Sequence, residues 1–156
     1  MKVYQRINRI LEIALIFLLS ILVIDVLWQV FSRYVLSSPS SFTDELAGYL
    51  LIWVSLLGAA YVAGRQEHLA IDILLQRSRP ARRKRIQLLI YLVILVFALS
   101  VMVIGGIWLV YTRFVLDVKS AALELPLGYV YIVLPLSGLL ISYFTIIHIH
   151  ELKQNN

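Results

Sequence analysis

The sequence contains no cysteine at any of its 156 positions. A disulfide framework, a thiolate nucleophile and a cysteine-ligated metal site are therefore excluded. Charged residues are also scarce, at 15% of the chain, whereas apolar residues make up 61%. The mean hydropathy of +0.88 is far above that of soluble domains. This composition is that of a membrane protein.

The net charge of +5 would suggest a nucleic-acid partner if the protein were soluble. Here the basic residues gather at the ends of apolar runs instead. Contact with anionic lipid and control of membrane orientation explain such a distribution better. We therefore expect anionic lipids, and no nucleic acid, among the partners.

Four apolar runs are each long enough to cross the roughly 30 Å of a bilayer's hydrocarbon as a helix. The first is too long for a secretory signal and lacks a convincing cleavage site. The charged stretch after the second run, read as a helix, places polar residues on one face and apolar residues on another. This is typical of a helix lying in the membrane interface. The sequence predicts an all-α integral membrane protein, residues 1–156 forming one membrane domain. We place the spans at about 10–35, 44–64, 86–111 and 129–149, and the amphipathic interfacial helix at about 66–79.

Basic residues are unevenly distributed between the two sides of these spans. Of the 14 Lys and Arg residues, 11 lie at the termini and in the second connection, and three in the other two connections. The positive-inside rule then places both termini in the cytoplasm, so that a reporter near Ser40 or Ser120 lies outside and one near Arg83 inside. Residues predicted at the cytoplasmic interface and lipid headgroups are Arg65, His68, Asp72, Arg82, Arg83, Lys84 and Arg85.

The second span has one face of mostly small residues and an opposite face of large ones, including Trp53 and Leu57. Small residues four apart allow helix backbones to approach closely in lipid. We therefore predict a surface for a partner subunit. Changing Trp53 or Leu57 to another large apolar residue should matter less if the opposite face meets lipid or loosely packed neighbours. The alternative is that small residues are simply common in membrane helices. The predicted surface comprises Asp44, Glu45, Gly48, Ser55, Ala59 and Ala63.

An acidic residue, Asp25, lies inside the first span, where it costs about 3 kcal/mol unless it finds partners. Gln29 and Arg33 follow at helical spacing, so the three residues can form a polar ladder along one face. We expect a structural role for Asp25, satisfied by Gln29, Arg33 or a neighbouring subunit, and therefore expect Asp25→Asn to preserve assembly. A proton or cation site is the functional alternative.

Candidate ligands for a metal or cofactor are few. Glu67, His68 and Asp72 have a spacing that could suit a metal, but no further His is nearby, and we predict neither a metal site nor a cofactor. Two alternative functions remain at this point. One is a b-type haem anchor using His68 and His148, both near the cytoplasmic side. The other is a self-sufficient proton-coupled exporter using Asp25.

Several short motifs, in order along almost the whole chain, resemble one family. They include the Arg33-Tyr34 pair, Asp44-Glu45-Leu46-Ala47 followed by Tyr49-Leu50-Leu51-Ile52-Trp53, and Leu57-Gly58-Ala59-Ala60. Arg65-x-Glu67-His68-x-x-Ile71-Asp72, a basic segment and a last helix with Pro126, Tyr131 and Pro135-Leu136 complete the pattern. The chain resembles the small, Q-type (DctQ-like) membrane subunit of tripartite ATP-independent periplasmic (TRAP) transporters.

This resemblance implies an accessory scaffold subunit, without enzymatic activity, in the bacterial inner membrane. Its implied partners are a large membrane subunit that carries the substrate path and a periplasmic substrate-binding protein. The implied process is sodium-coupled import of organic acids such as dicarboxylates or sialic acid. The residues independently favour an accessory role, because transport sites are usually built from pairs of interrupted helices. This chain shows one predicted kink, at Pro135 and Gly138, and no matching second one.

Overall fold

A computed structural model describes residues 2–38, 40–65 and 80–154 of the chain. Within these residues, four helices are long and apolar enough to cross a bilayer, which confirms the predicted all-α membrane fold. The predicted interfacial helix at 66–79 lies outside the described residues. The elements are α1 (Lys2–Tyr34), α2 (Ser41–Arg65), α4 (Pro80–Phe97), the π-helix η1 (Ala98–Gly105), α5 (Gly106–Val115), α6 (Leu127–Tyr131) and α7 (Val133–Gln154).

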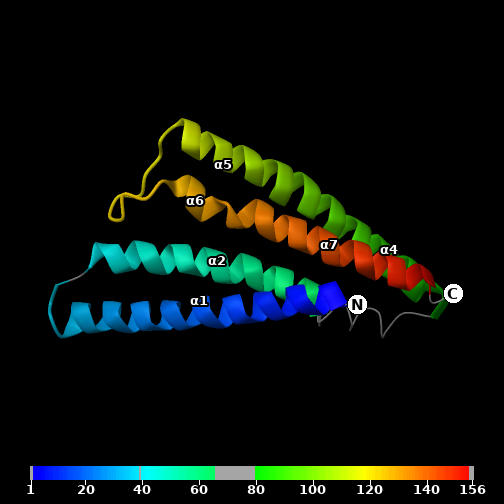
Figure 1. The fold of residues 1–156 in the computed structure, drawn as a ribbon, viewed down its shortest axis with the longest axis horizontal. Coiled ribbons are helices and arrows are strands. Elements are labelled where there is room, and N and C mark those ends of the chain that lie inside the picture. Colours follow the sequence, from blue (N-terminus) through cyan, green and yellow to red (C-terminus); the bar gives the residue numbers. More distant parts are fainter. Residues whose placement is uncertain (1, 39, 66–79, 155–156) are drawn as a thin grey trace.

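The four spans lie side by side in the order α1, α2, α7 and the continuous α4–η1–α5 helix (Figure 1). Both ends of the chain lie at one end of the molecule, and the connections at 35–40 and 116–126 lie at the other (Figure 1). The last span is the most enclosed, with 39% of its most apolar stretch buried, against 11% for α1. The first helix therefore leaves most of its apolar surface to lipid or to other subunits.

The core lies where α7 meets its neighbours. Phe144 is fully buried, and its ring packs edge-on against Tyr4 of α1 at a centroid distance of 5.4 Å. Val133 and Leu57 belong to the same cluster, so this contact joins α1, α2 and α7. A second cluster, around Ala60 and other small or flexible residues, joins α2 and η1 to α7. Shape complementarity holds these helices together, because lipid tails remove the hydrophobic driving force between them.

The predicted kink in the last span takes the form of a break at Ile132, between α6 and α7. Pro135 explains the position of the break, because its ring removes a donor and clashes with the carbonyl four residues earlier, that of Tyr131. Gly138 has a different role from the one we predicted. It allows α7 to approach η1 so closely that an added Cβ would lie 2.7 Å from Met102 Cβ.

We predict that Gly138→Ala destabilises the isolated protein by about 1–3 kcal/mol, because the added methyl group overpacks the η1–α7 contact. Gly48→Ala is the matched control, since nothing lies within 4 Å of a Cβ at Gly48. Thermal unfolding in detergent measures both variants. Equal melting temperatures for Gly138→Ala and the wild type would show that the η1–α7 contact is looser than described.

Candidate partner-binding surface

A strip of α2 is left bare by the rest of the described chain. Gly48, Ser55 and Ala59 are all exposed, and Asp44 lies at the end of the strip nearest the 35–40 connection. These four residues recur at helical spacing and so lie along one side of the helix. We call them the small-residue strip. Leu51, one turn from Gly48 and from Ser55, is also exposed on this side. The small residues beside it allow another helix to come close, which is how membrane helices associate.

Two residues that we predicted for this surface are used inside the chain. Ala63 is buried in the cluster with η1 and α7. Both carboxylate oxygens of Glu45 accept backbone hydrogen bonds, from the Ala121 N–H at 3.0 Å and from the Leu123 N–H at 3.2 Å. Glu45 therefore fastens the 116–126 connection to α2, and Asp44 alone of the acidic pair remains on the strip.

The opposite face of α2 packs against other helices rather than meeting lipid or loose neighbours. Leu57 is buried among α1, α2 and α7. The Trp53 indole N–H donates to the Val130 carbonyl at 3.0 Å and so joins α2 to α6. These large residues fill the space between helices, whereas Gly48, Ser55 and Ala59 are left outside together with Phe42 and Leu51. The condition for Trp53 and Leu57, that their face meets lipid or loose neighbours, is therefore not met.

The predicted polar ladder is not connected within the described chain. The Gln29 amide donates to the Asp44 carboxylate, across the α1–α2 seam. Arg33 is exposed beside the same pair. Asp25 is only 7% exposed, and its Oδ2 has no hydrogen-bond partner among the described residues. Neither Gln29 nor Arg33 satisfies it, so of our three predicted partners only a neighbouring subunit is left.

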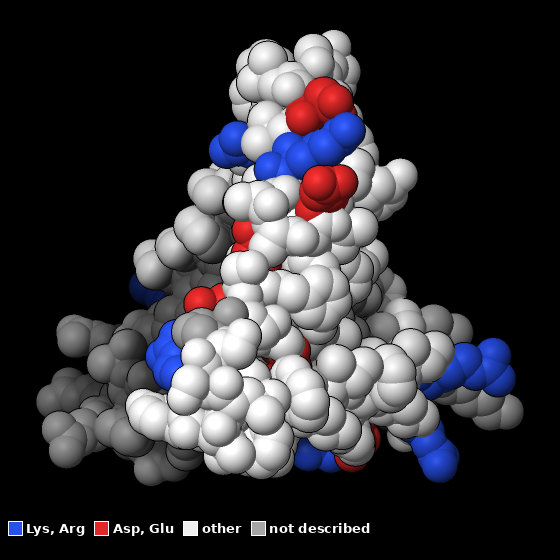
Figure 2. Space-filling model, turned by 90° about the vertical axis from the view of Figure 1, so that its left-hand side faces the viewer, with Lys and Arg blue, Asp and Glu red and all other residues white. Residues whose placement is uncertain are grey.

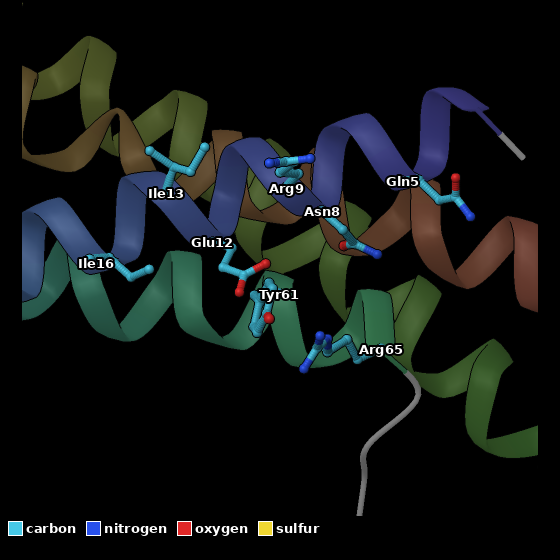
Figure 3. A pocket seen from close by; sticks show the side chains of 8 residues that line it. All are labelled: Gln5, Asn8, Arg9, Glu12, Ile13, Ile16, Tyr61 and Arg65. Carbon is cyan, nitrogen blue, oxygen red and sulfur yellow. The ribbon is translucent and has the colours of Figure 1, made fainter.

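The other end of the α1–α2 seam carries a polar groove of about 540 Å³ (Figure 3). Glu12 of α1 lies beside Tyr61 of α2, and the Arg65 guanidinium stacks 5.1 Å from the centre of the Tyr61 ring (Figure 3). Ile13 and Ile16 continue the groove along α1 towards the apolar part of the span. Charged groups beside apolar ones are suited to the boundary between headgroups and acyl chains.

Two of the other predicted interface residues, Lys84 and Arg85, have described side chains. Lys84 is half-buried and Arg85 is exposed, both in the first turns of α4. His68 and Asp72 lie outside the described residues, as do the side chains of Arg82 and Arg83. The predicted headgroup contacts stay a prediction.

Of the candidate haem and metal ligands, Glu67, His68 and Asp72 lie outside the described residues, and only His148 is described. His148 is buried between the rings of Tyr4 and Tyr91, with centroid distances of 6.2 Å and 6.0 Å. A porphyrin would have to replace these rings to reach the imidazole. Among the residues described, no three His, Asp or Glu side chains are grouped as a metal site would require.

Charges of both signs lie among a mostly uncharged surface at the end of the molecule with the 116–126 connection (Figure 2). The connection is a tight structure rather than a loose loop, because the Leu127 N–H donates to the Val118 carbonyl at 2.9 Å and the Ser120 N–H to Leu125 at the same distance. Lys119 pairs with Asp117 at 3.4 Å on the surface of this connection.

The role of Glu45 in holding the 116–126 connection was not predicted from the sequence. The sequence shows only that Glu45 lies early in α2. An acidic residue at that position is equally well explained by a favourable interaction with the helix dipole.

These features define a multi-pass helical membrane protein whose spans bury little of each other and whose second helix has an exposed small-residue strip. The chain belongs to the DctQ component family of the tripartite ATP-independent periplasmic transporters, whose profile matches residues 21–154. That family is a membrane subunit of transporters, which is not a class of enzyme. The predicted resemblance is thereby confirmed.

Three relatives are similar to the chain. A TRAP transporter small permease protein from Haemophilus influenzae (strain Rd) is 29% identical over 138 residues, which are 87% of this chain and 83% of that protein. The sialic acid TRAP transporter small permease protein SiaQ of Vibrio cholerae is 29% identical over 99 residues, or 64% of this chain and 57% of SiaQ. The sialic acid TRAP transporter permease protein SiaT of H. influenzae (strain 86-028NP) is 34% identical over 73 residues, or 44% of this chain but only 12% of SiaT.

Proposed function

We propose that this chain is the scaffold subunit of a sodium-coupled, binding-protein-dependent importer of organic acids, and that it holds the large membrane subunit through the small-residue strip of α2. The observation that carries the proposal is the exposure of Gly48, Ser55 and Ala59 on a helix whose bulky face is already packed. Small residues exposed in the middle of a membrane span allow another helix to pack closely.

The small extent of the bundle supports an accessory role. A transport site needs polar groups enclosed near the midplane, usually at a pair of interrupted helices. Within the described chain, the break at Ile132 is the only interruption of a spanning α-helix apart from the π-helix η1. The part of SiaT that is similar to this chain is a small fraction of a much longer permease, which fits a small subunit that works beside a large one.

The proposed substrate is an organic acid of the sialic acid or dicarboxylate type. Sialic acid is named for two of the relatives, SiaQ and SiaT, and a periplasmic binding protein fits the tripartite family. Substrate choice would belong to the binding protein and the large subunit, because the described cavities of this chain are open grooves at helix seams. The self-sufficient exporter is disfavoured because the groove beside Asp25 is otherwise lined mainly by apolar residues.

We propose that the protein resides in the bacterial inner membrane with both termini in the cytoplasm. Because the chain has no cysteine, single cysteines report its orientation without background. Asp117→Cys should react with a membrane-impermeant maleimide applied from the periplasmic side. Arg85→Cys should react only after the membrane is opened. Asp117 is a better position than Ser120, which is buried. The reverse pattern of labelling would contradict the orientation.

Purification of the tagged chain in mild detergent tests the proposed partnership. A large permease subunit should co-purify with it at a defined ratio. Purification of the chain alone, from cells that also produce the large subunit, would contradict the proposal. A haem absorption band in the pure sample would instead favour the haem alternative.

A further inference from the structure

Asp25 lies in a groove where no described donor bonds to its Oδ2. The groove has a volume of about 460 Å³ and lies between α1 and the start of α2. The side chains of Ile24, Trp28 and Phe42 form much of its wall, and each is about half exposed or more. The carboxyl group of Asp25 is thus set into an apolar surface that faces away from the core of the bundle.

Two nearby hydrogen-bond donors are used elsewhere, and the Ser40 hydroxyl and Trp28 indole, which also line the groove, do not bond to Asp25 Oδ2. The Gln29 amide, one helical turn further along α1, donates to Asp44. The Thr43 hydroxyl, which lines the groove, donates to the Ser40 carbonyl at 3.0 Å. Asp25 is more than nine-tenths buried, and its Oδ2 has no partner in the part of the chain that is described. A buried acidic group in a membrane span that lacks a partner is costly, and such residues almost always pair.

Lipid tails cannot supply the missing donor. Asp25 lies nine residues before Tyr34, the last residue of α1, which corresponds to about 13 Å along the helix axis. Acyl chains have no hydrogen-bond donors, so a lipid tail against the groove would leave Asp25 Oδ2 unpaired. A protein side chain carried on another membrane helix can bring a donor there.

We infer that a transmembrane helix of the large subunit lies in this groove and donates a hydrogen bond to Asp25. This inference rests on the proposed function and adds a second contact to it. The groove is lined by Phe42, Thr43 and Leu46 of α2, whereas the small-residue strip begins at Asp44 and continues through Gly48. The large subunit therefore contacts the α1–α2 hairpin on two sides, by close packing on one and by a hydrogen bond on the other.

Two substitutions at Asp25 separate this role from a structural one. Asp25→Asn keeps an oxygen acceptor and should bind the large subunit within about twofold of the wild type. Asp25→Leu keeps the branched shape, with a larger volume, but removes the acceptor, and should weaken binding about three- to fifteenfold, the range of one interhelical hydrogen bond in a membrane. The isolated Asp25→Leu chain should be as stable as the wild type or more so, since no bond within the chain is lost.

Cross-linking locates the contact directly. Ile24→Cys and Phe42→Cys, labelled with a photoreactive maleimide in the cysteine-free chain, should cross-link to the large subunit. Val23→Cys is the matched control, because Val23 lies at the same depth and is exposed, but does not line the groove.

The inference is overturned if Asp25→Leu binds like the wild type, if Asp25→Asn binds as weakly as Asp25→Leu, or if Asp25→Leu unfolds the isolated chain. Cross-links from Val23 without cross-links from the two groove positions would also overturn it. These failures are distinct from failure of the proposed function, in which the wild-type chain itself would not bind the large subunit.

Discussion

Ala59→Leu should leave the protein inserted and folded but lower its affinity for the large subunit about five- to 150-fold. Ala59 is exposed in the isolated chain, so the larger side chain meets nothing there. In the proposed complex it would overpack a close helix contact, at a cost of about 1–3 kcal/mol. Uptake should fall in parallel with assembly. Co-purification and uptake in proteoliposomes measure the two effects.

Ser55→Leu should behave in the same way, and Ser100→Leu provides its matched control. Both serines are exposed within spans, but Ser100 lies in η1, on a different helix from the small-residue strip. We expect Ser100→Leu to assemble normally. The small-residue strip would lose its proposed role if both serine variants assembled equally, or if Ala59→Leu abolished uptake in an intact complex.

Leu57→Ala should have the opposite effect, destabilising the isolated chain while leaving the small-residue strip unchanged. Leu57 is 5% exposed at the meeting of α1, α2 and α7. Truncation leaves a cavity that costs about 2–5 kcal/mol in soluble proteins. We expect the lower end of that range, because lipid lessens the gain from burying an apolar side chain.

Leu51→Ala is the matched control for Leu57→Ala, since Leu51 lies on the same helix and is 56% exposed. Its melting temperature in detergent should equal that of the wild type. Equal losses in the two variants would show that the two faces of α2 do not differ as the structure describes.

The number of spans was readable from the sequence because a membrane span is specified by a long apolar run alone. The break before α7 was readable too, because Pro135 acts on the turn just before it. The bulky face of α2 was assigned to the wrong environment for a physical reason. In lipid, both the interior and the exterior of a bundle are apolar, so hydrophobicity does not tell them apart.

The candidate surface was predictable only in part. The periodicity of α2 correctly grouped Gly48, Ser55 and Ala59, since helical spacing is a local property. The contacts of Glu45 and Trp53 depend on residues more than 70 positions away, at the 116–126 connection and α6. No local pattern reports such partners. The Trp53 indole N–H did signal that a polar partner was needed, because buried indoles usually find one.

Uptake by proteoliposomes tests the scaffold role most directly. Vesicles containing the large subunit and this chain, supplied with binding protein, a sodium gradient and labelled sialic acid or a dicarboxylate, should accumulate the substrate. Vesicles containing this chain alone should accumulate none, and vesicles with the large subunit alone should lose most of the uptake. Full uptake without this chain, or any uptake by this chain alone, would contradict the account.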